Sequence, residues 1–462
     1  MTTNNHSNKT ILVGAGLSGS LLSIYLAMRG YEVDIFERRP DMRNTEISAG
    51  RSINMALSTR GIFALQEVDV LDEIMRQAIP MCGRMVHAID GELSFLPYGK
   101  DDSEVIYSIS RGGLNMALMD AAEKKHGVTI QFNEKCTGMN LETGEAQFYN
   151  AVQKISKKIN TGTIIGTDGS ASAIRMAMFA MPRFNYSQQY IEHGYKELSI
   201  PPGPGGTFQI EKNALHIWPR GAYMLIALPN MDGSFTCTLF YPFAGENSFE
   251  SLNTGDDVVR FFQQQFPDAV PLMPTLVDDF FANPTGSLVT VRCFPWHFGE
   301  RVALLGDAAH AIVPFFGQGM NCCFEDCTYL NQCIEKYNGN WEHIFADYEN
   351  LRKDNADAIA DLALANFIEM RDHVADPKFA LKKEIELALE KRFPALFIPK
   401  YSMVTFHRDI PYATALKRGK KQEQILDILC EPIDDVDELD WGKARDLIHN
   451  GLGNLPLQNK AT

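Results

Sequence analysis

The start of the chain alternates between short apolar runs and helical spacing. Residues 10–13 are an apolar run that ends at a glycine, which is typical of a buried strand. Residues 17–29 have apolar positions at helical spacing and end at Gly30, a frequent C-terminal stop. Residues 31–36 alternate again and indicate a second strand. Together these segments predict a β-α-β unit.

The patterning changes further along the chain. We expect residues 51–85 to be mostly helical and loop-like, with Leu57, Leu65 and Leu71 facing a core. Short apolar segments between turns then predict antiparallel strands at residues 195–200, 216–218, 223–228 and 235–240. Residues 302–305 indicate a buried parallel strand. The stretch 325–391 is amphipathic at helical spacing.

These elements predict an α/β fold with three parts. A Rossmann-type nucleotide-binding domain is expected to be discontinuous, because strand signals of the parallel type lie at both ends of the antiparallel segment. We expect it to comprise residues 1–68, 103–180 and 290–335. An inserted antiparallel β-sheet domain would take residues 69–102 and 181–289, and a C-terminal helical region residues 336–462.

Charge and apolar content exclude two classes of protein. The 58 acidic and 43 basic residues give a net charge of −15, and such an acidic surface argues against nucleic-acid binding. Residues 11–28 carry no charge, but the glycines in the first half of this run argue against a signal peptide or membrane helix. No other uninterrupted apolar run approaches membrane length, and the C-terminal tail has too few apolar residues to span a bilayer, so we expect no membrane anchor.

Nine cysteines are scattered through the chain, which favours reduced thiols and a cytoplasmic location over a disulfide framework. Cys322, Cys323 and Cys327 cluster and raise the alternative of a metal site. No Cys-x-x-Cys pair is present, so we expect small buried thiols and no metal.

Three glycines follow the first predicted strand. Gly14 permits a tight turn, Gly16 lets the backbone approach a pyrophosphate, and Gly19 lets the helix pack closely on the strand. The helix N-terminus offers free N–H groups to the phosphates. Glu37, at the end of the next strand, can accept ribose hydroxyls and favours a ribose without a 2′-phosphate, as in FAD or NAD.

A second cofactor motif lies nearly three hundred residues later. Asp307 follows a predicted strand and can bind ribityl hydroxyls, although such a residue is also a common helix N-cap. The turn Gly317-Gln318-Gly319 would leave N–H groups beside a flavin ring that becomes negative on reduction. We expect His310 to be a packing or capping residue. The two motifs together indicate a Rossmann-type FAD-binding domain.

The motifs, with Asp168-Gly169 and Arg175 between them, resemble the flavoprotein aromatic hydroxylases, the group that includes para-hydroxybenzoate hydroxylase. Further segments resemble its kynurenine-hydroxylating members, up to about residue 420: 36–40, 50–54, 83–87, 97–104, 193–198, 215–219 and 399–406. The chain departs from some members at Phe316, where they have a histidine.

The resemblance implies an activity: hydroxylation of L-kynurenine to 3-hydroxy-L-kynurenine by FAD, NADPH and O2 through a flavin hydroperoxide, with no catalytic side chain and no metal. NADPH would bind transiently, because no second Gly-x-Gly-x-x-Gly lies on a β-α-β unit. The enzyme would be a monomer or a homodimer.

The resemblance also implies a site. Arg84 and Tyr98 would bind the substrate carboxylate, with Asn366 and Tyr401 beside them. The aromatic part of the substrate pocket would be lined by Leu215, Ile226, Leu228, Phe240 and Phe315. Further cofactor contacts would come from Leu17, Arg38, Ala56, Arg111, Asp168, Met320 and Asn321.

Three alternatives remain open from the sequence. One is a flavin hydroxylase of another aromatic acid. Another is a non-catalytic flavin-binding regulatory protein. A reductase with two dinucleotide sites is disfavoured by the missing second glycine motif.

Overall fold

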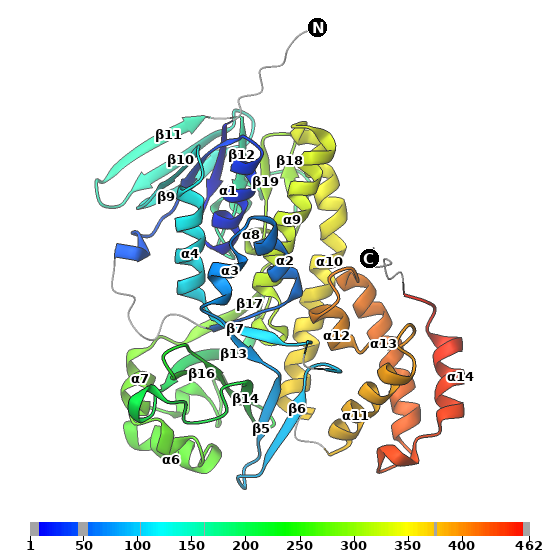
Figure 1. The fold of residues 1–462 in the computed structure, drawn as a ribbon. Coiled ribbons are helices and arrows are strands. Elements are labelled where there is room, and N and C mark those ends of the chain that lie inside the picture. Colours follow the sequence, from blue (N-terminus) through cyan, green and yellow to red (C-terminus); the bar gives the residue numbers. More distant parts are fainter. Residues whose placement is uncertain (1–8, 45–53, 102, 161, 374–376, 456–462) are drawn as a thin grey trace.

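A six-stranded sheet forms the upper half of the molecule in Figure 1. The computed structural model describes the chain except residues 1–8, 45–53, 102, 161, 374–376 and 456–462. The strand order is β18-β19-β12-β1-β2-β8, with parallel pairing from β19 to β8. The bounds are β1 Lys9–Val13, β2 Glu32–Phe36, β8 Val128–Gln131, β12 Thr163–Gly166, β18 His297–Phe298 and β19 Val302–Leu304.

The predicted β-α-β unit is confirmed as β1, helix α1 (Leu17–Met28) and β2. Helices α1 and α4 (Arg111–Glu123) pack against one another beside this sheet. Ile11 and Ile35 are both fully buried although the register places them on opposite faces, so both faces of the sheet are covered. Strand β12 lies between β1 and β19, so this sheet joins three separate stretches of the chain. The predicted α/β class with a Rossmann-type sheet is therefore confirmed.

A seven-stranded sheet forms the lower half, in the order β17-β13-β16-β15-β14-β5-β6. Its strands pair antiparallel except β14 with β5, which are parallel. The bounds are β5 Gly83–His87, β6 Leu93–Pro97, β13 Asn185–Ile200, β14 Ala214–Pro219, β15 Met224–Pro229, β16 Phe235–Pro242 and β17 Gly286–Phe294. Helices α6 (Gly255–Gln265) and α7 (Leu276–Ala282) pack beside it.

The expectation of helix and loop over residues 51–85 is wrong in part; residues 51–53 lie outside the described chain. Helices α2 (Thr59–Glu67) and α3 (Leu71–Met75) are present. Strands β3 (Asn54–Leu57) and β4 (Ile79–Met81) flank them and pair with β7 (Ile106–Ser110). Strands of three or four residues are too short to show a period of two in the sequence. A separate three-stranded meander, also not anticipated, comprises β9 Glu134–Asn140, β10 Glu145–Asn150 and β11 Ile155–Asn160.

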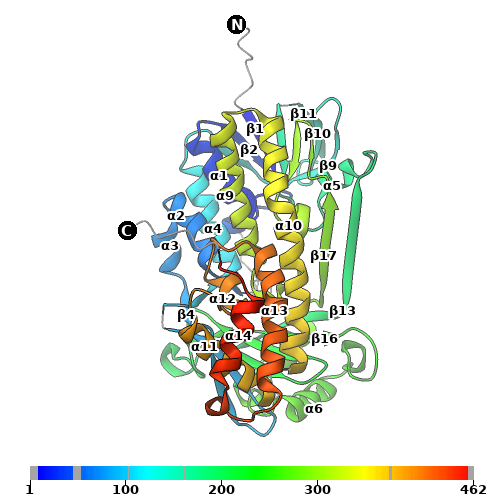
Figure 2. The same ribbon diagram turned by 90° about the vertical axis from the view of Figure 1, so that its right-hand side faces the viewer.

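Long helices connect the two halves. Helix α9 (Gly319–Tyr337) packs against α1, α2 and α10 (Trp341–Ile368), and α10 runs along the molecule toward the lower sheet (Figure 2). A π-helical turn, Glu369–His373, ends α10. The C-terminal helices have their own apolar core, and their bounds are α11 Pro377–Arg392, α12 Lys400–Thr405, α13 Tyr412–Cys430 and α14 Trp441–Gly451. None of the described helices is both long and apolar enough to cross a bilayer.

Candidate active site

One continuous cavity of about 530 Å³ runs from the glycine turn after β1 to the face of the seven-stranded sheet. It brings together most of the residues predicted for cofactor and substrate. Those that line it are Gly14, Gly16, Leu17, Glu37, Arg38, Ala56, Arg84, Tyr98, Arg111, Asp168, Leu215, Ile226, Leu228, Phe240, Asp307, Phe315, Gly317, Gly319, Met320 and Tyr401. The two halves of the predicted site are therefore neighbours.

The remaining predicted residues lie behind the cavity wall. Asn321 is fully buried and donates to Ala56 O at 2.8 Å and Gly317 O at 2.9 Å. Gln318 donates to Ser58 Oγ, and Asn366 donates to Phe315 O at 2.7 Å. Gly19 allows α1 to pack on β1, because a Cβ there would lie 2.0 Å from Gly14 O. Asn321, Gln318 and Asn366 hold wall residues or their neighbours in place.

The glycine turn forms an open anion cradle. Gly14 has φ +106°, and a Cβ there would lie 2.7 Å from Thr167 O, so this position requires glycine. Gly16 is the N-cap of α1. No side chain of the described residues caps the helix, and a Cβ at Gly16 would meet none of their atoms within 4 Å. The first N–H groups of α1 are thus available to a phosphate, which fits the pyrophosphate of FAD.

Glu37 is buried beside this cradle, with 5 % of its surface exposed. Its carboxylate accepts from Ala15 N at 2.9 Å and from Arg39 N and Nε at 2.9 and 2.8 Å. Burial alone would raise the pKa of Glu37, but Arg39 and the amides lower it below its ordinary value. The side chain is therefore an ionised acceptor at the edge of the cavity.

A second helix N-terminus faces the other end of the cofactor region. Gly317 has φ +68°, and α9 begins two residues later at Gly319, where its first turn borders the cavity. Asp307 is the first residue of α8 (Asp307–His310), whose N-cap is Gly306. The carboxylate of Asp307 is therefore not the N-cap of that helix, and it lines the cavity instead.

Asp168 and Arg175 stabilise the cavity wall between these two helix ends through separate contacts. Asp168 Oδ2 accepts from Ala173 N at 2.6 Å, at the start of α5 (Ala173–Met178). Burial raises the pKa of Asp168, and its Oδ1 has no hydrogen-bond partner within the described chain. Arg175 is 2 % exposed and donates to Ala308 O at 2.7 Å. Arg175 thus ties α5 to α8 from behind the cavity.

At the far end of the cavity, two aromatic rings flank a buried guanidinium. Arg84 is 8 % exposed and lies 5.6 Å from the ring centre of Tyr98 and 5.5 Å from that of Tyr401. Its Nε has no hydrogen-bond partner within the described chain. Burial opposes the charge, but Tyr98, Tyr401 and Glu369 raise the pKa of Arg84 above its ordinary value. The site therefore presents a fixed positive charge to an anionic ligand.

The wall between Arg84 and the cofactor region is apolar. Leu215, Ile226 and Phe240 come from neighbouring strands of the lower sheet, and Phe315 packs on Phe240 with ring centres 4.9 Å apart. The prediction missed Thr236, Thr238 and Met370, which also line the cavity. The threonines share the strand face of Phe240 at a spacing of two, a signal that the sequence contained.

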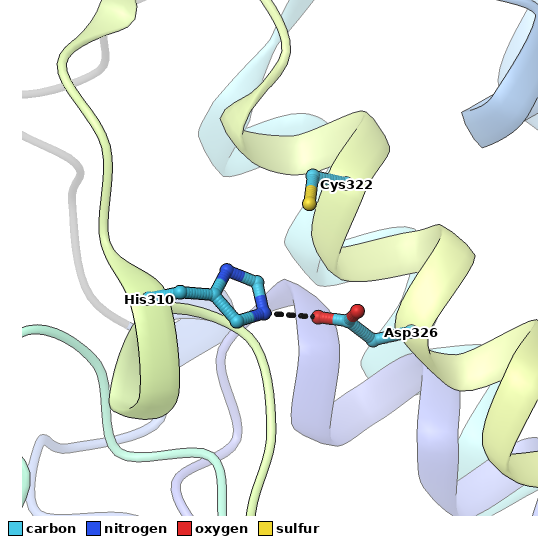
Figure 3. Close-up of side chains that lie close together, drawn as sticks. All are labelled: His310, Cys322 and Asp326. Carbon is cyan, nitrogen blue, oxygen red and sulfur yellow. Dashed lines mark hydrogen bonds and ion pairs between the residues drawn. The ribbon is translucent and has the colours of Figure 1, made fainter. Parts of the chain in front are cut away.

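The cysteine cluster lies behind the cofactor region as buried thiols. Figure 3 shows His310, Cys322 and Asp326, whose polar atoms approach one another closely. Asp326 accepts from Arg352 Nε at 2.7 Å and bonds His310 Nε2 at 2.7 Å, and Arg352 also lies 3.4 Å from Cys322 Sγ. Burial raises the pKa of the Cys322 thiol well above its ordinary value. Arg352 already supplies the positive charge here, and His310 belongs to this ion-paired network.

Comparison with known proteins identifies the class. The FAD binding domain family matches residues 7–192 and 278–363. A solved structure of 2-methyl-3-hydroxypyridine-5-carboxylic acid oxygenase superposes with a TM-score of 0.65 at 20% identity, covering 81% of this chain and 95% of that one. The protein is thus an FAD-binding flavoprotein with the fold of the flavin monooxygenases.

Relatives with similar sequences show to which family within this class the chain belongs. The chain is 52% identical to kynurenine 3-monooxygenase of Myxococcus xanthus over 441 residues, which is 96% of this chain and 95% of the relative. It is 46% identical to kynurenine 3-monooxygenase of Dictyostelium discoideum over 460 residues, 96% and 98% of the two chains. The chain belongs to the kynurenine 3-monooxygenase family.

Proposed function

We propose that the protein hydroxylates L-kynurenine to 3-hydroxy-L-kynurenine with bound FAD, NADPH as a transient co-substrate and O2. The observation that carries this is the shared cavity: an open pyrophosphate cradle at one end and the buried Arg84 guanidinium at the other. The names of the relatives agree with that substrate. Bound FAD would accept hydride from NADPH and activate O2.

The chain's own residues would bind and orient the cofactor and the substrate. The N–H groups at Gly16 and Leu17 would bind the pyrophosphate, and Glu37 the adenosine ribose. Leu17, Arg38, Ala56, Arg111, Asp168, Asp307, Gly317, Gly319 and Met320 would complete the cofactor contacts, with Gln318 and Asn321 supporting them from behind.

Arg84 would form a charge-assisted pair with the substrate carboxylate. Tyr98 and Tyr401 stay protonated, since burial raises the pKa of both phenols, so each can donate a hydrogen bond. Asn366 would act by holding the Phe315 carbonyl. Leu215, Ile226, Leu228, Phe240 and Phe315 would enclose the aromatic ring and exclude water from it.

The test is product formation by the purified protein. It should be yellow with bound FAD, and NADPH with kynurenine should give 3-hydroxykynurenine, identified by mass spectrometry. Anthranilate and 4-hydroxybenzoate serve as comparison substrates for a hydroxylase of another aromatic acid. Hydroxylation of those acids but not of kynurenine would contradict the substrate, and retention of FAD without NADPH oxidation would support the regulatory alternative.

The same proposal includes the cellular compartment and the oligomeric state of the enzyme. All nine cysteines are free thiols, which fits a reducing cytoplasm. A monomer or a homodimer is expected, and light scattering after gel filtration measures which one forms.

A further inference from the structure

Three segments meet beside the loop that carries Tyr98. Glu104 lies in that loop, Glu390 near the C-terminal end of α11, and His407 between α12 and α13. One oxygen or nitrogen from each of the three side chains lies within 4.8 Å of the others. Glu104 is 7 % exposed and Glu390 1 %. The two carboxylates are therefore buried at a junction between the loop of Tyr98 and the C-terminal helices, while the His407 side chain is 24% exposed.

The junction holds more negative than positive charge among the residues that the structure describes. Neither carboxylate oxygen of Glu390 accepts a hydrogen bond within the described chain. The nearest cation is Lys100, whose Nζ lies 3.2 Å from Glu104 Oε1 and 3.6 Å from Glu390 Oε1. The other group in reach is the His407 imidazole, whose Nε2 lies 3.9 Å from Glu104 Oε1. With that imidazole neutral, two buried carboxylates face one ammonium and one negative charge is uncompensated, which is costly in a protein interior. Burial first, and Glu104 second, raise the pKa of Glu390 to about 7, which reflects the same deficit.

The donor set indicates what could compensate this charge. Two carboxylate oxygens and one imidazole nitrogen suit a divalent transition metal such as Zn²⁺, whereas Mg²⁺ and Ca²⁺ prefer oxygen ligands alone. The side chain of Lys100 is 36% exposed, so its ammonium can turn to solvent and leave the space between the carboxylates. In the His310 cluster, by contrast, Arg352 is fully buried and cannot leave.

We propose that Glu104, Glu390 and His407 form a site for a divalent transition-metal ion of the Zn²⁺ class. The ion would join the loop of Tyr98 to α11 and to the segment after α12. Glu104 is well placed to transmit this constraint to the loop, because its side chain packs closely on Gly99. A Cβ added at Gly99 would lie 2.2 Å from the Cβ of Glu104. Metal binding would then fix the loop that carries one of the carboxylate-binding phenols.

The test is direct metal binding to the purified full-length protein with FAD bound. After removal of trace metal with a chelator, Zn²⁺ binding is measured by equilibrium dialysis and calorimetry near neutral pH, with Mg²⁺ in parallel. Glu390→Gln keeps the shape and removes one charged ligand, so it should bind Zn²⁺ at least about tenfold more weakly at this site. Glu384→Gln changes an exposed residue of the same helix and should bind like the parent.

Two further measurements keep the result decisive. Zn²⁺ should raise the unfolding temperature of the parent and of Glu384→Gln but not of Glu390→Gln. If Glu390→Gln fails to fold, His407→Ala replaces it, with flavin content and circular dichroism as checks. Equal Zn²⁺ affinity in parent and variants, or no Zn²⁺ binding by the parent, overturns the proposal and leaves a proton as the compensating charge.

Discussion

Tyr98 and Tyr401 stack with their ring centres 5.1 Å apart and their planes 13° from parallel. They come from the loop after β6 and from α12, and the Arg84 guanidinium lies near both rings. Phe316 also stacks on Tyr401, with ring centres 5.5 Å apart. This aromatic stack connects the Arg84 end of the cavity to Phe316, the residue that precedes Gly317.

Arg84 should be required for substrate binding and not for FAD. Arg84→Met removes the counter-charge of a buried carboxylate, so kynurenine binding should weaken by about 3–5 kcal/mol. Arg84→Lys keeps the charge but loses the planar fork and should still impair binding. Kynurenine affinity is measured by flavin absorbance, with FAD content determined for each variant and the exposed Arg445→Met as control. Loss of FAD or unfolding would instead assign Arg84 a structural role.

Glu37→Gln should weaken FAD binding. The amide keeps the shape of Glu37 but removes charge-assisted acceptance, worth about 1–3 kcal/mol, which is roughly tenfold or more in affinity. FAD dissociation is followed by the recovery of flavin fluorescence. Glu32→Gln, at the exposed start of the same strand, is the control. Unchanged FAD affinity in Glu37→Gln would remove Glu37 from the cofactor site.

Two glycines of the cradle should differ in their response to alanine. At Gly16 the backbone is unstrained and a Cβ meets no atom of the described chain within 4 Å. Gly16→Ala should therefore fold normally and bind FAD poorly, because the methyl group enters the phosphate space. Gly14→Ala should lose stability, since its φ is +106° and the Cβ would lie 2.7 Å from Thr167 O. Thermal unfolding and flavin content separate the two effects. Normal FAD binding by Gly16→Ala would place the phosphates elsewhere.

His216 should make stability fall on mild acidification. Its Nε2 lies 2.7 Å from Glu211 O, which can only accept, so Nε2 carries the proton and Nδ1 accepts from His87 Nε2 at 2.8 Å. Burial lowers the pKa of His216 from 6.5 to about 4. The unfolded chain therefore binds this proton more readily, and the stabilisation present above pH 6.5 is lost as the pH falls toward 4.

Each pKa unit by which burial lowers the pKa of His216 corresponds to about 1.4 kcal/mol. The free energy of unfolding should therefore fall by roughly 3 kcal/mol on acidification. Urea unfolding of the parent and of His216→Gln over this pH range measures it, because glutamine can donate and accept but does not titrate. The variant should show a shallower pH dependence, whereas the exposed His449→Gln should follow the parent. Identical slopes for parent and His216→Gln would contradict the assignment.

Substrate should accelerate reduction of the flavin. The notable feature is that one cavity joins the cofactor and substrate regions, while the sequence has no second dinucleotide motif for NADPH. A transient hydride donor would be used efficiently only when substrate is already in place. Stopped-flow reduction by NADPH, with and without kynurenine, measures the difference. Equal rates would mean that kynurenine binding does not control access of the donor.

The sequence by itself determined the cofactor half of the site. The spacing of Gly14, Gly16 and Gly19 acts locally, because a tight turn and a helix N-terminus depend on neighbouring residues, and the structure keeps that unit as predicted. Local pattern was less informative where strands were short, which is why β3 and β4 were missed. The predictions for the substrate region depend on resemblance, since no local spacing distinguishes Arg84 from a surface arginine.

Only the tertiary structure brought Arg84, Tyr98 and Tyr401 to one end of a cavity whose other end is the glycine cradle. Their side chains come from β5, the loop after β6 and α12, and their proximity depends on how the seven-stranded sheet packs against the C-terminal helices. The same is true of the cluster of Glu104, Glu390 and His407, where the charges of the two carboxylates matter because packing removes them from water. Contacts between residues far apart in sequence are set by burial of whole surfaces, which no short motif records.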